Sequence, residues 1–234
     1  MIDTHSHILY GIDDGSRNIE ESINIIKSYN EIGIKNIILT PHYIKDTSYI
    51  SPKQDNIKIL EKLKKEIQEK NINTNLYLGN EIYIDKDIED LLKEKTISSL
   101  NDTKYLLIEL PMSGKKEGYY DIFLDLVNKG YKVVLAHPER YRTFQEDFER
   151  VYELVDIGVL FQCNIGSIVG QYGTSAKKTM KRMLKEDLVY ILGTDVHRYK
   201  DNSYIIKANK KIKRYTNKEQ YNNIIKENAK ELLK

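Results

Sequence analysis

Seven short runs rich in apolar and β-branched residues recur along the chain, and they constrain the fold more than any other feature of the sequence. Most of them are continuously apolar rather than alternating, as is typical of parallel strands that are buried on both faces. They cover residues 1–5, 36–40, 75–81, 104–110, 132–137, 159–164 and 189–195. Segments with helical patterns separate them, and the spacing of roughly 30 residues is that of one βα unit. This pattern predicts an α/β fold with a parallel sheet.

Helix-capping signals mark the segments between these runs. Asn18-x-x-Glu21 is a capping box and Gly33 closes the helix that follows, while Ser51-Pro52 places an N-cap and a proline at the start of the next helix. The remaining helices are predicted at 117–128, 145–156, 174–185 and, beginning with Thr216-x-x-Glu219, at about 216–233. Seven strands alternating with helices favour a closed or nearly closed barrel, with an open doubly wound sheet as the alternative. Because no linker, repeat or low-complexity segment interrupts the pattern, residues 1–234 are predicted to form a single domain.

The composition excludes several classes of function. The 37 basic and 35 acidic residues give a net charge of +2, which is too small to indicate a nucleic-acid or membrane-surface partner. The N-terminus lacks the charged start and apolar run of a signal peptide, and no apolar run approaches the roughly 20 residues of a membrane span, so the expected location is the cytoplasm. The single cysteine, Cys163, excludes a disulfide framework. A cysteine-based phosphatase is excluded too, because the residue six positions later is Val169 rather than arginine.

All five histidines of the chain lie at or just after the C-terminal ends of predicted strands. His5 and His7 are two residues apart, so in a strand their imidazoles point the same way. His137 ends the fifth run, and His42 and His197 follow the second and last runs. In a parallel barrel these strand ends meet at one face, where active sites are built. A single histidine at such a position is more often an ordinary polar residue of the rim, but five at one pole indicate a metal site.

Acidic residues occupy the same strand ends. Glu81, Glu109 and Asp195 end or follow three of the runs, and Asp13-Asp14 lies between the first run and the first helix. One acid of this kind more often caps the next helix than binds a metal, but imidazole and carboxylate together suit manganese, iron or zinc. Clustered acids also suit ions roughly 3.5–4 Å apart, as in phosphatases and nucleases. The pattern therefore predicts a multi-metal hydrolase.

These residues resemble the motifs of a known superfamily, PHP (polymerase and histidinol phosphatase). The superfamily motifs are matched by His5-Ser6-His7, Pro41-His42, Glu81, Glu109, His137-Pro138 and Asp195-Val196-His197. More narrowly, the chain resembles the manganese-dependent protein-tyrosine phosphatases that are encoded in capsule and exopolysaccharide operons of Gram-positive bacteria. This resemblance is carried by residues 1–15, Thr40-Pro-His42, Gly79-x-Glu81, Ala136-His-Pro-Glu-Arg140 and Gly193-Thr-Asp-x-His197. It runs from Met1 to about His197 and implies a distorted (β/α)7 TIM-like barrel, the PHP fold.

The resemblance implies a centre of three divalent metal ions, with Mn²⁺ as the first choice and Fe or Zn as alternatives. The ligands it implies are His5, His7, Glu81 and Asp195 for the first ion, Glu81, Glu109 and His137 for the second, and Asp14, His42 and His197 for the third. Glu81 would bridge the first two ions. Asp13 is the alternative to Asp14, because spacing alone cannot choose between adjacent acids. Asp3 is expected to support a ligand or the packing rather than bind an ion.

The resemblance also assigns roles in the reaction. Arg140, one short turn after His137, is expected to hold the phosphoryl group, with a surface ion pair to Glu139 or Glu146 as the alternative. Glu109 and His137 join Arg140 as the catalytic residues, and a hydroxide that bridges the metals is expected to attack phosphorus in line. Because a tyrosine phenol has an ordinary pKa of about 10, the phenolate leaves without a strong general acid.

Four other polar residues have weaker claims on the site. Arg198 and Arg17 are candidates for binding the substrate phosphate, although both are equally compatible with a surface position. Gln162 and Asn164, at the end of the sixth run, could line the same pocket. Ordinary strand-end polar residues are the favoured interpretation of these two amides.

The predicted function is therefore that of a metal-dependent protein-tyrosine phosphatase. The resemblance implies a phosphotyrosyl protein as partner, namely a bacterial tyrosine autokinase that controls capsular or exopolysaccharide synthesis. The alternatives are a small-molecule phosphatase of the histidinol-phosphate type, a PHP nuclease, and a metal-stabilised regulatory module without catalysis. The sequence indicates no oligomeric state.

Overall fold

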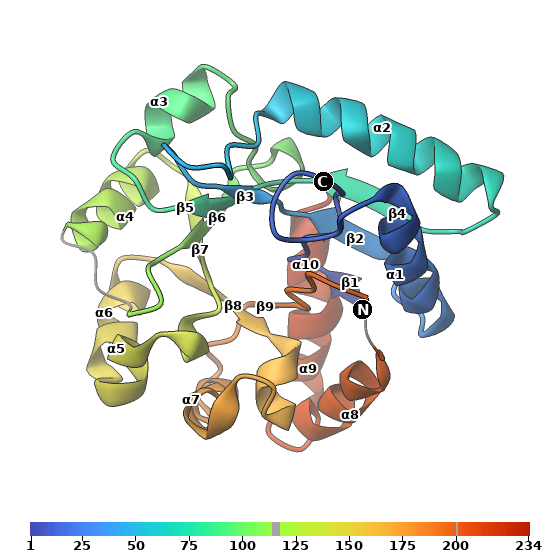
Figure 1. Ribbon diagram of the computed structural model, residues 1–234. Helices are drawn as coiled ribbons and strands as arrows, with labels where there is room; N and C mark the ends of the chain where they lie inside the picture. Colours follow the sequence, from blue (N-terminus) through green and yellow to red (C-terminus); the bar gives the residue numbers. More distant parts are fainter. Residues whose placement is uncertain (114–117, 200) are drawn as a thin grey trace.

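Short parallel strands surround a common centre in the computed structural model, which describes residues 1–113, 118–199 and 201–234 (Figure 1). The strands are β1 (Ile2–Asp3), β2 (Asn36–Leu39), β3 (His42–Tyr43), β4 (Asn75–Leu78), β5 (Glu81–Tyr83), β6 (Tyr105–Glu109), β7 (Lys132–Ala136), β8 (Leu160–Asn164) and β9 (Ile191–Gly193). Each of the seven predicted runs contains at least one of them. Every neighbouring pair is parallel, which confirms the predicted strand direction.

The strands form two hydrogen-bonded sheets that curl together into a distorted barrel. One sheet has the order β1-β2-β4 and the other has the order β3-β5-β6-β7-β8-β9. The curl closes between the first and last strands, where Ser6 forms a parallel bridge with Val196. Beside it, the backbone N–H of Asp195 donates to the carbonyl of His5 at 2.9 Å. The predicted α/β barrel is confirmed, and the open doubly wound sheet is not the fold.

At two of the seven runs the strand breaks and a second strand follows it, and these breaks distort the barrel. Directly after the second run Pro41, which has no N–H to donate, separates β2 from β3. In the third run the break falls at Gly79, where a Cβ would lie 2.7 Å from Leu100 Cδ2. After each break the chain joins the second sheet, in which His42 is paired with Glu81. The breaks therefore bring these two residues into the sheet that also carries β6 to β9.

Helices cover the outside of the barrel and connect its strands. The α-helices are α1 (Ile19–Glu31), α2 (Lys53–Glu69), α3 (Ile88–Lys93), α4 (Tyr119–Asn128), α5 (Arg142–Glu146), α6 (Glu149–Asp156), α7 (Gly173–Lys185), α8 (Ser203–Ile212), α9 (Lys218–Asn222) and α10 (Asn228–Glu231). A π-helical turn, η4 (Asn223–Glu227), joins the last two, and 3-10 turns occur at η1 (Leu100–Asp102), η2 (Pro138–Arg140) and η3 (Ile165–Val169).

The caps of the first two helices agree only partly with prediction. Asn18 caps α1 and accepts from the Glu21 backbone N–H at 2.9 Å, as predicted. The Glu21 carboxylate does not return to Asn18, and this half of the predicted box is absent. Ser51 is not the N-cap of α2, which is Pro52. The Ser51 hydroxyl instead donates to the His42 carbonyl at 2.6 Å, a long-range contact that competes with local capping.

Other helix boundaries differ from prediction in length and position. The single helix predicted at 145–156 is two helices, α5 and α6, because the chain turns at Asp147. The capping box of the last helix is formed by Asn217 and Gln220, one residue later than predicted. Helices α3 and α8 were not predicted, although Ile205 and Ile212 on the buried face of α8 follow a helical spacing. Position 117, where α4 was predicted to begin, lies outside the described residues.

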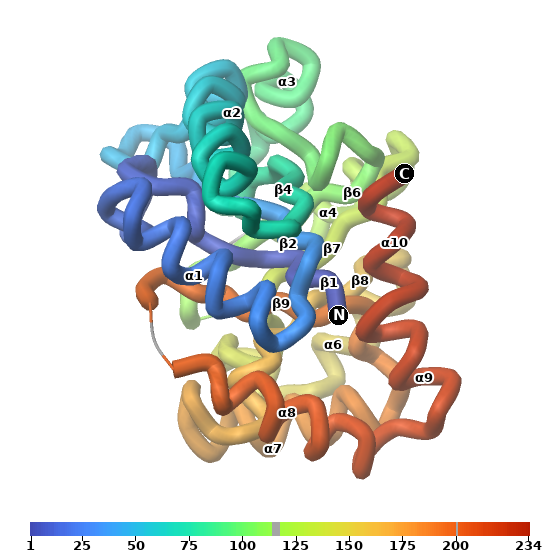
Figure 2. Tube along the Cα trace, turned by 90° about the vertical axis from the view of Figure 1, so that its right-hand side faces the viewer, coloured from blue at the N-terminus to red at the C-terminus, as the bar shows by residue number. Residues whose placement is uncertain are grey.

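The C-terminal segment closes one end of the barrel. The interior of the barrel holds an apolar cluster to which the strands and the C-terminal segment both contribute. Its members are Ile2, Ile38, Leu100, Leu107, Val134, Ala136, Ile191, Ala229 and Leu232. Figure 2 shows the segment from α9 to α10 running along the side of the barrel where the N-terminus also lies. Asn228 fastens it by donating to the carbonyl of Tyr190, just before β9, at 2.9 Å. The opposite end, where the strands finish, is left for the polar residues.

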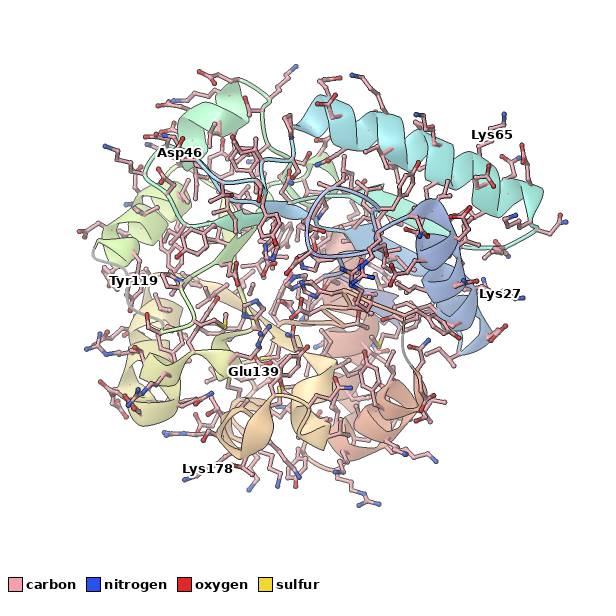
Figure 3. The ribbon with its side chains drawn as sticks, viewed as in Figure 1. Lys27, Asp46, Lys65, Tyr119, Glu139 and Lys178 are labelled. Atoms are coloured by element: carbon pink, nitrogen blue, oxygen red, sulfur yellow. The ribbon has the colours of Figure 1, made fainter. Side chains whose placement is uncertain are left out.

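Charged side chains cover the surface, but several carboxylates are buried, among them that of Glu139. Lys27, Lys65 and Lys178 point outward from α1, α2 and α7, whereas Glu139 lies inside the molecule (Figure 3). Glu139 is fully buried. Among the residues that the structure describes, no helix combines the length and the apolar character needed to cross a membrane.

Candidate metal centre

The C-terminal ends of the strands bring all nine predicted metal ligands into one cluster. His5 and His7 follow β1, His42 begins β3, His137 follows β7 and His197 follows β9. The carboxylates that join them are those of Asp14, Glu81, Glu109 and Asp195. Each of the nine side chains lies within 4 Å of another member. Contacts within the cluster divide it into three overlapping groups.

The tightest group joins His5, His7, Glu81 and Asp195. The two imidazoles face each other through their Nε2 atoms, which are 3.2 Å apart. Glu81 Oε2 lies 3.2 Å from each of these nitrogens, and Asp195 Oδ1 lies 3.6 Å from the first and 3.4 Å from the second. Donor atoms that are about 2.1 Å from a tetrahedral metal ion lie about 3.4 Å from one another. The spacing of these donors therefore fits a single ion between them.

A second group lies next to the first and shares Glu81 with it. His137 Nε2 lies 2.9 Å from Glu81 Oε1 and 3.6 Å from Glu109 Oε1. His42 Nδ1 approaches the same carboxylates, at 3.1 Å from Glu81 Oε2 and 3.7 Å from Glu109 Oε2. This buried nitrogen makes no hydrogen bond. A buried ring nitrogen that faces carboxylate oxygens without a hydrogen bond is an arrangement that a metal ion would complete.

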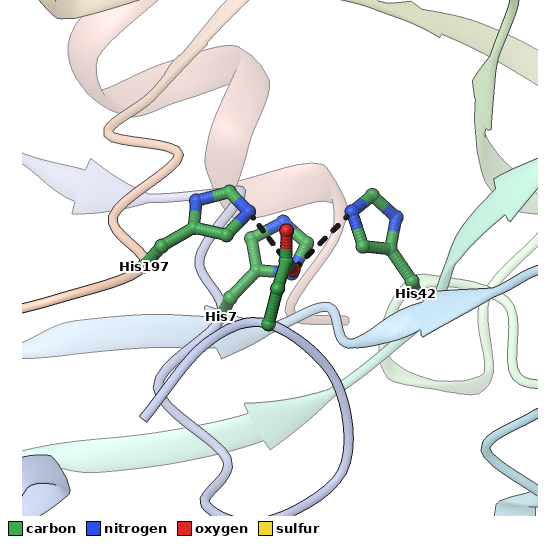
Figure 4. A group of neighbouring side chains, drawn as sticks. His7, His42 and His197 are labelled. Atoms are coloured by element: carbon green, nitrogen blue, oxygen red, sulfur yellow. Dashed lines mark ion pairs between the residues drawn. The ribbon is translucent and has the colours of Figure 1, made fainter. Parts of the chain in front are cut away.

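The third group is the most open to solvent. Asp14 Oδ1 lies 3.3 Å from His197 Nε2 and 3.7 Å from His42 Nε2. Figure 4 shows the rings of His7, His42 and His197 converging from three separate segments of the chain. The side chains of Asp14 and His197 are 46% and 30% exposed, whereas that of Glu81 is 1% exposed. His42 thus faces two groups, with a different ring nitrogen toward each.

Asp13 lies outside the three groups and orients two of their histidines. Its Oδ2 lies 2.7 Å from His7 Nδ1 and accepts from the His42 backbone N–H at 2.9 Å, while its Oδ1 accepts from the Gly15 N–H at 2.8 Å. A Cβ at Gly15 would lie 2.0 Å from the His7 carbonyl, so only glycine lets this turn close on His7. Of the two adjacent acids, Asp14 lies among the clustered donors, whereas Asp13 holds the His7 ring and the His42 backbone in place.

The backbone is strained at two of the predicted ligands. His137 has φ 35° and Asp195 has φ 53°, in the left-handed region that residues other than glycine rarely adopt. Next to Asp195, Thr194 donates its N–H and its hydroxyl to Asp3 at 2.8 and 2.6 Å. Asp3 therefore fastens β1 to β9, and it also accepts from the His5 backbone N–H at 3.4 Å. Its carboxylate is not among the clustered donors. Strain of this kind persists where surrounding contacts fix it, and it is common at functional sites.

The carboxylates of the centre repel one another in a buried space. Burial alone would raise the pKa of Glu81, but the neighbouring histidines, His5 first, hold it well below its ordinary value. Burial, reinforced by the negative charges of Glu81 and Asp195, raises the pKa of Glu109 to about 9. Cations between these groups would relieve the repulsion. A donor set of imidazoles and carboxylates without thiolate suits Mn, Fe or Zn.

Arg140 points into the centre. Its Nη1 donates to Asp195 Oδ2 at 2.6 Å, and its guanidinium carbon lies 4.4 Å from the centre of the Tyr172 ring. Its ion-pair partner is therefore Asp195 rather than Glu139 or Glu146, the two alternatives that the sequence offered. Nothing in the sequence pattern singled out Tyr172, which is brought to Arg140 by the fold alone.

The other two arginines lie near α1. Arg198 Nη1 pairs with Glu21 at 3.3 Å, and the Arg17 backbone N–H donates to the same carboxylate at 2.9 Å. The Arg17 side chain is exposed. Of the three predicted arginines, only Arg140 is brought into contact with the clustered carboxylates.

Gln162 and Asn164 contact two of the predicted ligands. Gln162 Oε1 lies 2.8 Å from His5 Nδ1, and Asn164 Nδ2 donates to Asp195 Oδ2 at 2.7 Å. These amides are fully buried, so they are not the ordinary rim residues that the sequence favoured. Their signal in the sequence was their position at a strand end, which is the signal that identified the histidines.

A parallel α/β barrel with histidines and carboxylates clustered at its strand ends defines a class, the metal-dependent barrel hydrolases of the PHP type. Within this class the chain belongs to the CpsB/CapC family of capsular polysaccharide synthesis, whose profile matches residues 1–234. The predicted family membership is confirmed.

Relatives and solved structures agree with this assignment. Tyrosine-protein phosphatase CpsB of Streptococcus agalactiae serotype III (strain NEM316) is 32% identical over 240 residues, covering 100% of this chain and 98% of that protein. A solved structure superposes on this chain with a TM-score of 0.90. It belongs to the crystal structures of YwqE from Bacillus subtilis and CpsB from Streptococcus pneumoniae, which are described as unique metal-dependent tyrosine phosphatases. It is 32% identical and covers 100% of this chain and 94% of that chain. Histidinol phosphate phosphatase from Lactococcus lactis, with a TM-score of 0.61 at 15% identity over 92% of this chain and 93% of that chain, shares the fold.

Proposed function

We propose that this chain is a metal-dependent protein-tyrosine phosphatase that acts on phosphotyrosine in a protein of capsular or exopolysaccharide synthesis. The observation that carries the proposal is the cluster of nine imidazole and carboxylate side chains, in whose first group the donor atoms are 3.2–3.6 Å apart. The Streptococcus agalactiae relative and the superposed structure, both described as tyrosine phosphatases, support the choice of substrate.

The cluster is proposed to hold three divalent ions. His5, His7, Glu81 and Asp195 would hold the first, Glu81, Glu109 and His137 the second, and Asp14, His42 and His197 the third. The shared carboxylate of Glu81 supports this division, because its two oxygens face different histidines at 3.2 and 2.9 Å. Mn²⁺ is the first choice for the bound metal, with Fe or Zn as alternatives, since the donor set suits all three.

The chemistry divides between the ions and the chain. Divalent ions in such a centre lower the pKa of a bound water and neutralise charge on the phosphoryl group. Arg140 uses one N–H of its guanidinium on Asp195, which leaves further donors for phosphoryl oxygens. Glu109 and His137 act by holding the second ion beside the first. Because phenolate is a good leaving group, an aryl phosphate needs no further acid from the chain.

The remaining predictions about partners and place stand as proposals. We propose that the phosphotyrosyl partner is a bacterial tyrosine autokinase, that the reaction takes place in the cytoplasm, and that residues 1–234 work as one domain. Arg198 and Arg17 remain weaker candidates for phosphate binding, because Glu21 already engages Arg198.

Two alternatives from the sequence are less favoured. A regulatory module without catalysis would tolerate loss of ligands, whereas all nine side chains are present and clustered. A nuclease would require a basic groove, which a net charge of +2 does not promise. A histidinol-phosphate type of activity is kept as an arm of the test.

The test is phosphate release in the presence of Mn²⁺ from a phosphotyrosyl peptide, compared with a phosphoseryl peptide, histidinol phosphate and single-stranded DNA. We expect the phosphotyrosyl peptide to be hydrolysed fastest, and a chelator to abolish turnover until Mn²⁺ is added back. His5→Ala and His137→Ala should be inactive, and Lys178→Ala, on the outer face of α7, should match the parent. Full activity of either histidine variant would refute the metal centre, and inert phosphotyrosine beside an active rival substrate would refute the substrate.

A further inference from the structure

Two buried amides at the end of β8 link two of the proposed ligands through a chain of hydrogen bonds. His5 Nδ1 lies 2.8 Å from Gln162 Oε1, Gln162 Nε2 donates to Asn164 Oδ1 at 3.0 Å, and Asn164 Nδ2 donates to Asp195 Oδ2 at 2.7 Å. The side chains of His5, Gln162 and Asn164 are fully buried. These hydrogen bonds therefore connect His5 and Asp195, two members of the first group, through side chains that are shielded from solvent.

The direction of every hydrogen bond in this chain follows from one end. An ionised carboxylate accepts only, so Asn164 must turn its NH₂ toward Asp195 and its oxygen toward Gln162. Gln162 must then turn its NH₂ toward Asn164 and its oxygen toward His5. An oxygen can face His5 Nδ1 only if that nitrogen carries a proton. These hydrogen bonds thus have one consistent assignment, with a proton on His5 Nδ1, so that the neutral ring keeps its Nε2 lone pair for the first group.

The two amides lie in closely packed surroundings. A Cβ at Gly193 would lie 2.4 Å from His5 Cβ and 2.9 Å from Gln162 Nε2, so only glycine allows β9 to pass this close. The backbone N–H of Asn164 donates to the buried carboxylate of Glu139 at 2.8 Å. Glu139, the buried carboxylate that is labelled in Figure 3, thus holds the backbone of Asn164.

This series of hydrogen bonds leaves one oxygen of Asp195 free to face the first group. Asp195 Oδ2 accepts from both Asn164 Nδ2 at 2.7 Å and Arg140 Nη1 at 2.6 Å. Its other oxygen, Oδ1, is the one that lies 3.6 and 3.4 Å from the Nε2 atoms of His5 and His7. The carboxylate therefore divides its work, with one oxygen for the arginine and the amide and the other for the first group.

We propose that Gln162 and Asn164 are positioning residues of the metal centre, which fix His5 as the tautomer protonated at Nδ1 and hold Asp195 so that its Oδ1 faces the ion. The proposal rests on the proposed metal centre but not on the identity of the substrate. Hydrogen-bonded supports of this kind typically change metal affinity by about 10- to 100-fold when they are removed.

The first experiment measures Mn²⁺ affinity by competition with a fluorescent chelator. Gln162→Met and Asn164→Leu should each weaken binding by about 10- to 100-fold. The double variant should be no weaker than Asn164→Leu alone, because loss of Asn164 already releases Asp195 and frees the orientation of Gln162. The control is Asn202→Leu, which removes a buried amide that donates to Ser28 on α1, and it should bind Mn²⁺ like the parent. Parent-like affinity in both single variants, or losses that multiply in the double variant, would overturn the proposal.

A second measurement keeps the proposal testable even if the variants fold poorly. Long-range ¹H–¹⁵N NMR spectra of the unaltered protein loaded with Zn²⁺ report which imidazole nitrogens carry protons. We expect the His5 signal, assigned through its loss in His5→Gln, to show a proton on Nδ1, and a bare Nδ1 would overturn the proposal. If the unaltered protein bound neither Mn²⁺ nor Zn²⁺, the proposed function would fail, whereas normal binding with unaffected variants would remove only the role of the amides.

Discussion

Replacing Asp13 by asparagine tests the role that the structure gives to the acid beside the third group. Aspartate at this position accepts three hydrogen bonds, from His7 Nδ1, the His42 N–H and the Gly15 N–H. Asparagine has a single acceptor oxygen. Its favoured orientation keeps that oxygen on His7 and His42, and it leaves an NH₂ group against the buried N–H of Gly15.

The size of the effect follows from these contacts. A hydrogen bond to a charged group is worth about 1.5–3 kcal/mol and a neutral one about 0.5–1.5 kcal/mol, so losing the charge opposite His7 costs about 1–1.5 kcal/mol. The unpaired N–H of Gly15 adds about 1–3 kcal/mol, which is spread over folding and metal binding. The part that reaches the metal is bounded by the effect of other ligand supports, about 1.4–2.7 kcal/mol. Mn²⁺ affinity should therefore fall about 10- to 100-fold.

Activity titrated against free Mn²⁺, together with calorimetry, measures this loss. Because Asp13→Asn leaves all nine proposed ligands in place, most of the activity should return at saturating Mn²⁺. Asp46→Asn, an exposed acid of the β3–α2 loop, is the matched control and should behave like the parent. An Mn²⁺ affinity within about twofold of the parent would refute the supporting role. Weak binding with no recovery at saturation would show instead that Asp13 is itself a ligand.

Four further predictions concern Arg140, the C-terminal segment and the binding of metal. Arg140→Lys should lower kcat/KM for a phosphotyrosyl peptide by roughly 10²-fold, because lysine lacks the planar fork that contacts Asp195 and Tyr172, and unchanged steady-state kinetics would contradict this. Leu232 is fully buried in the apolar cluster inside the barrel, so Leu232→Ala should lower the free energy of unfolding by about 2–5 kcal/mol, measured in urea. Leu233→Ala, at the partly buried neighbour, should lower it clearly less. Adding Mn²⁺ to chelator-treated protein should raise its melting temperature, since an ion that binds only the folded state stabilises it, and a melting temperature independent of Mn²⁺ would argue against the centre. The affinity of the parent protein for Mn²⁺, titrated as for Asp13→Asn, should increase with pH, because protons and metal compete for the imidazoles.

The fold was predictable because its signals are local. Continuous apolar runs separated by capped helices specify parallel strands wherever they occur, and the predicted barrel contains a strand in each of the seven runs. Errors arose where a distant contact outweighed a local preference. Ser51 gave up its capping position for the carbonyl of His42, and Asp147 divides a helix that periodicity alone would continue.

The candidate centre was predictable for a related reason. In a parallel barrel the C-terminal ends of all strands meet at one mouth, so a histidine or acid at a strand end is placed near the others by topology alone. No finer geometry is needed to predict that residues as distant as His7 and His197 come together. The stacking of those two rings, 3.9 Å between centroids, is the outcome of that topology.

The sequence by itself thus determined the strand direction, the barrel and the set of side chains at its mouth, since these depend on residue type and spacing along the chain. Only the tertiary structure decided what each side chain does there. Asp14 rather than Asp13 reaches the clustered donors because Gly15 lets the turn close on His7. Asn164 supports Asp195 because β8 and β9 are neighbours in the sheet. Such contacts join residues far apart in sequence, and they form only when the packing of the whole barrel brings their side chains within hydrogen-bonding distance.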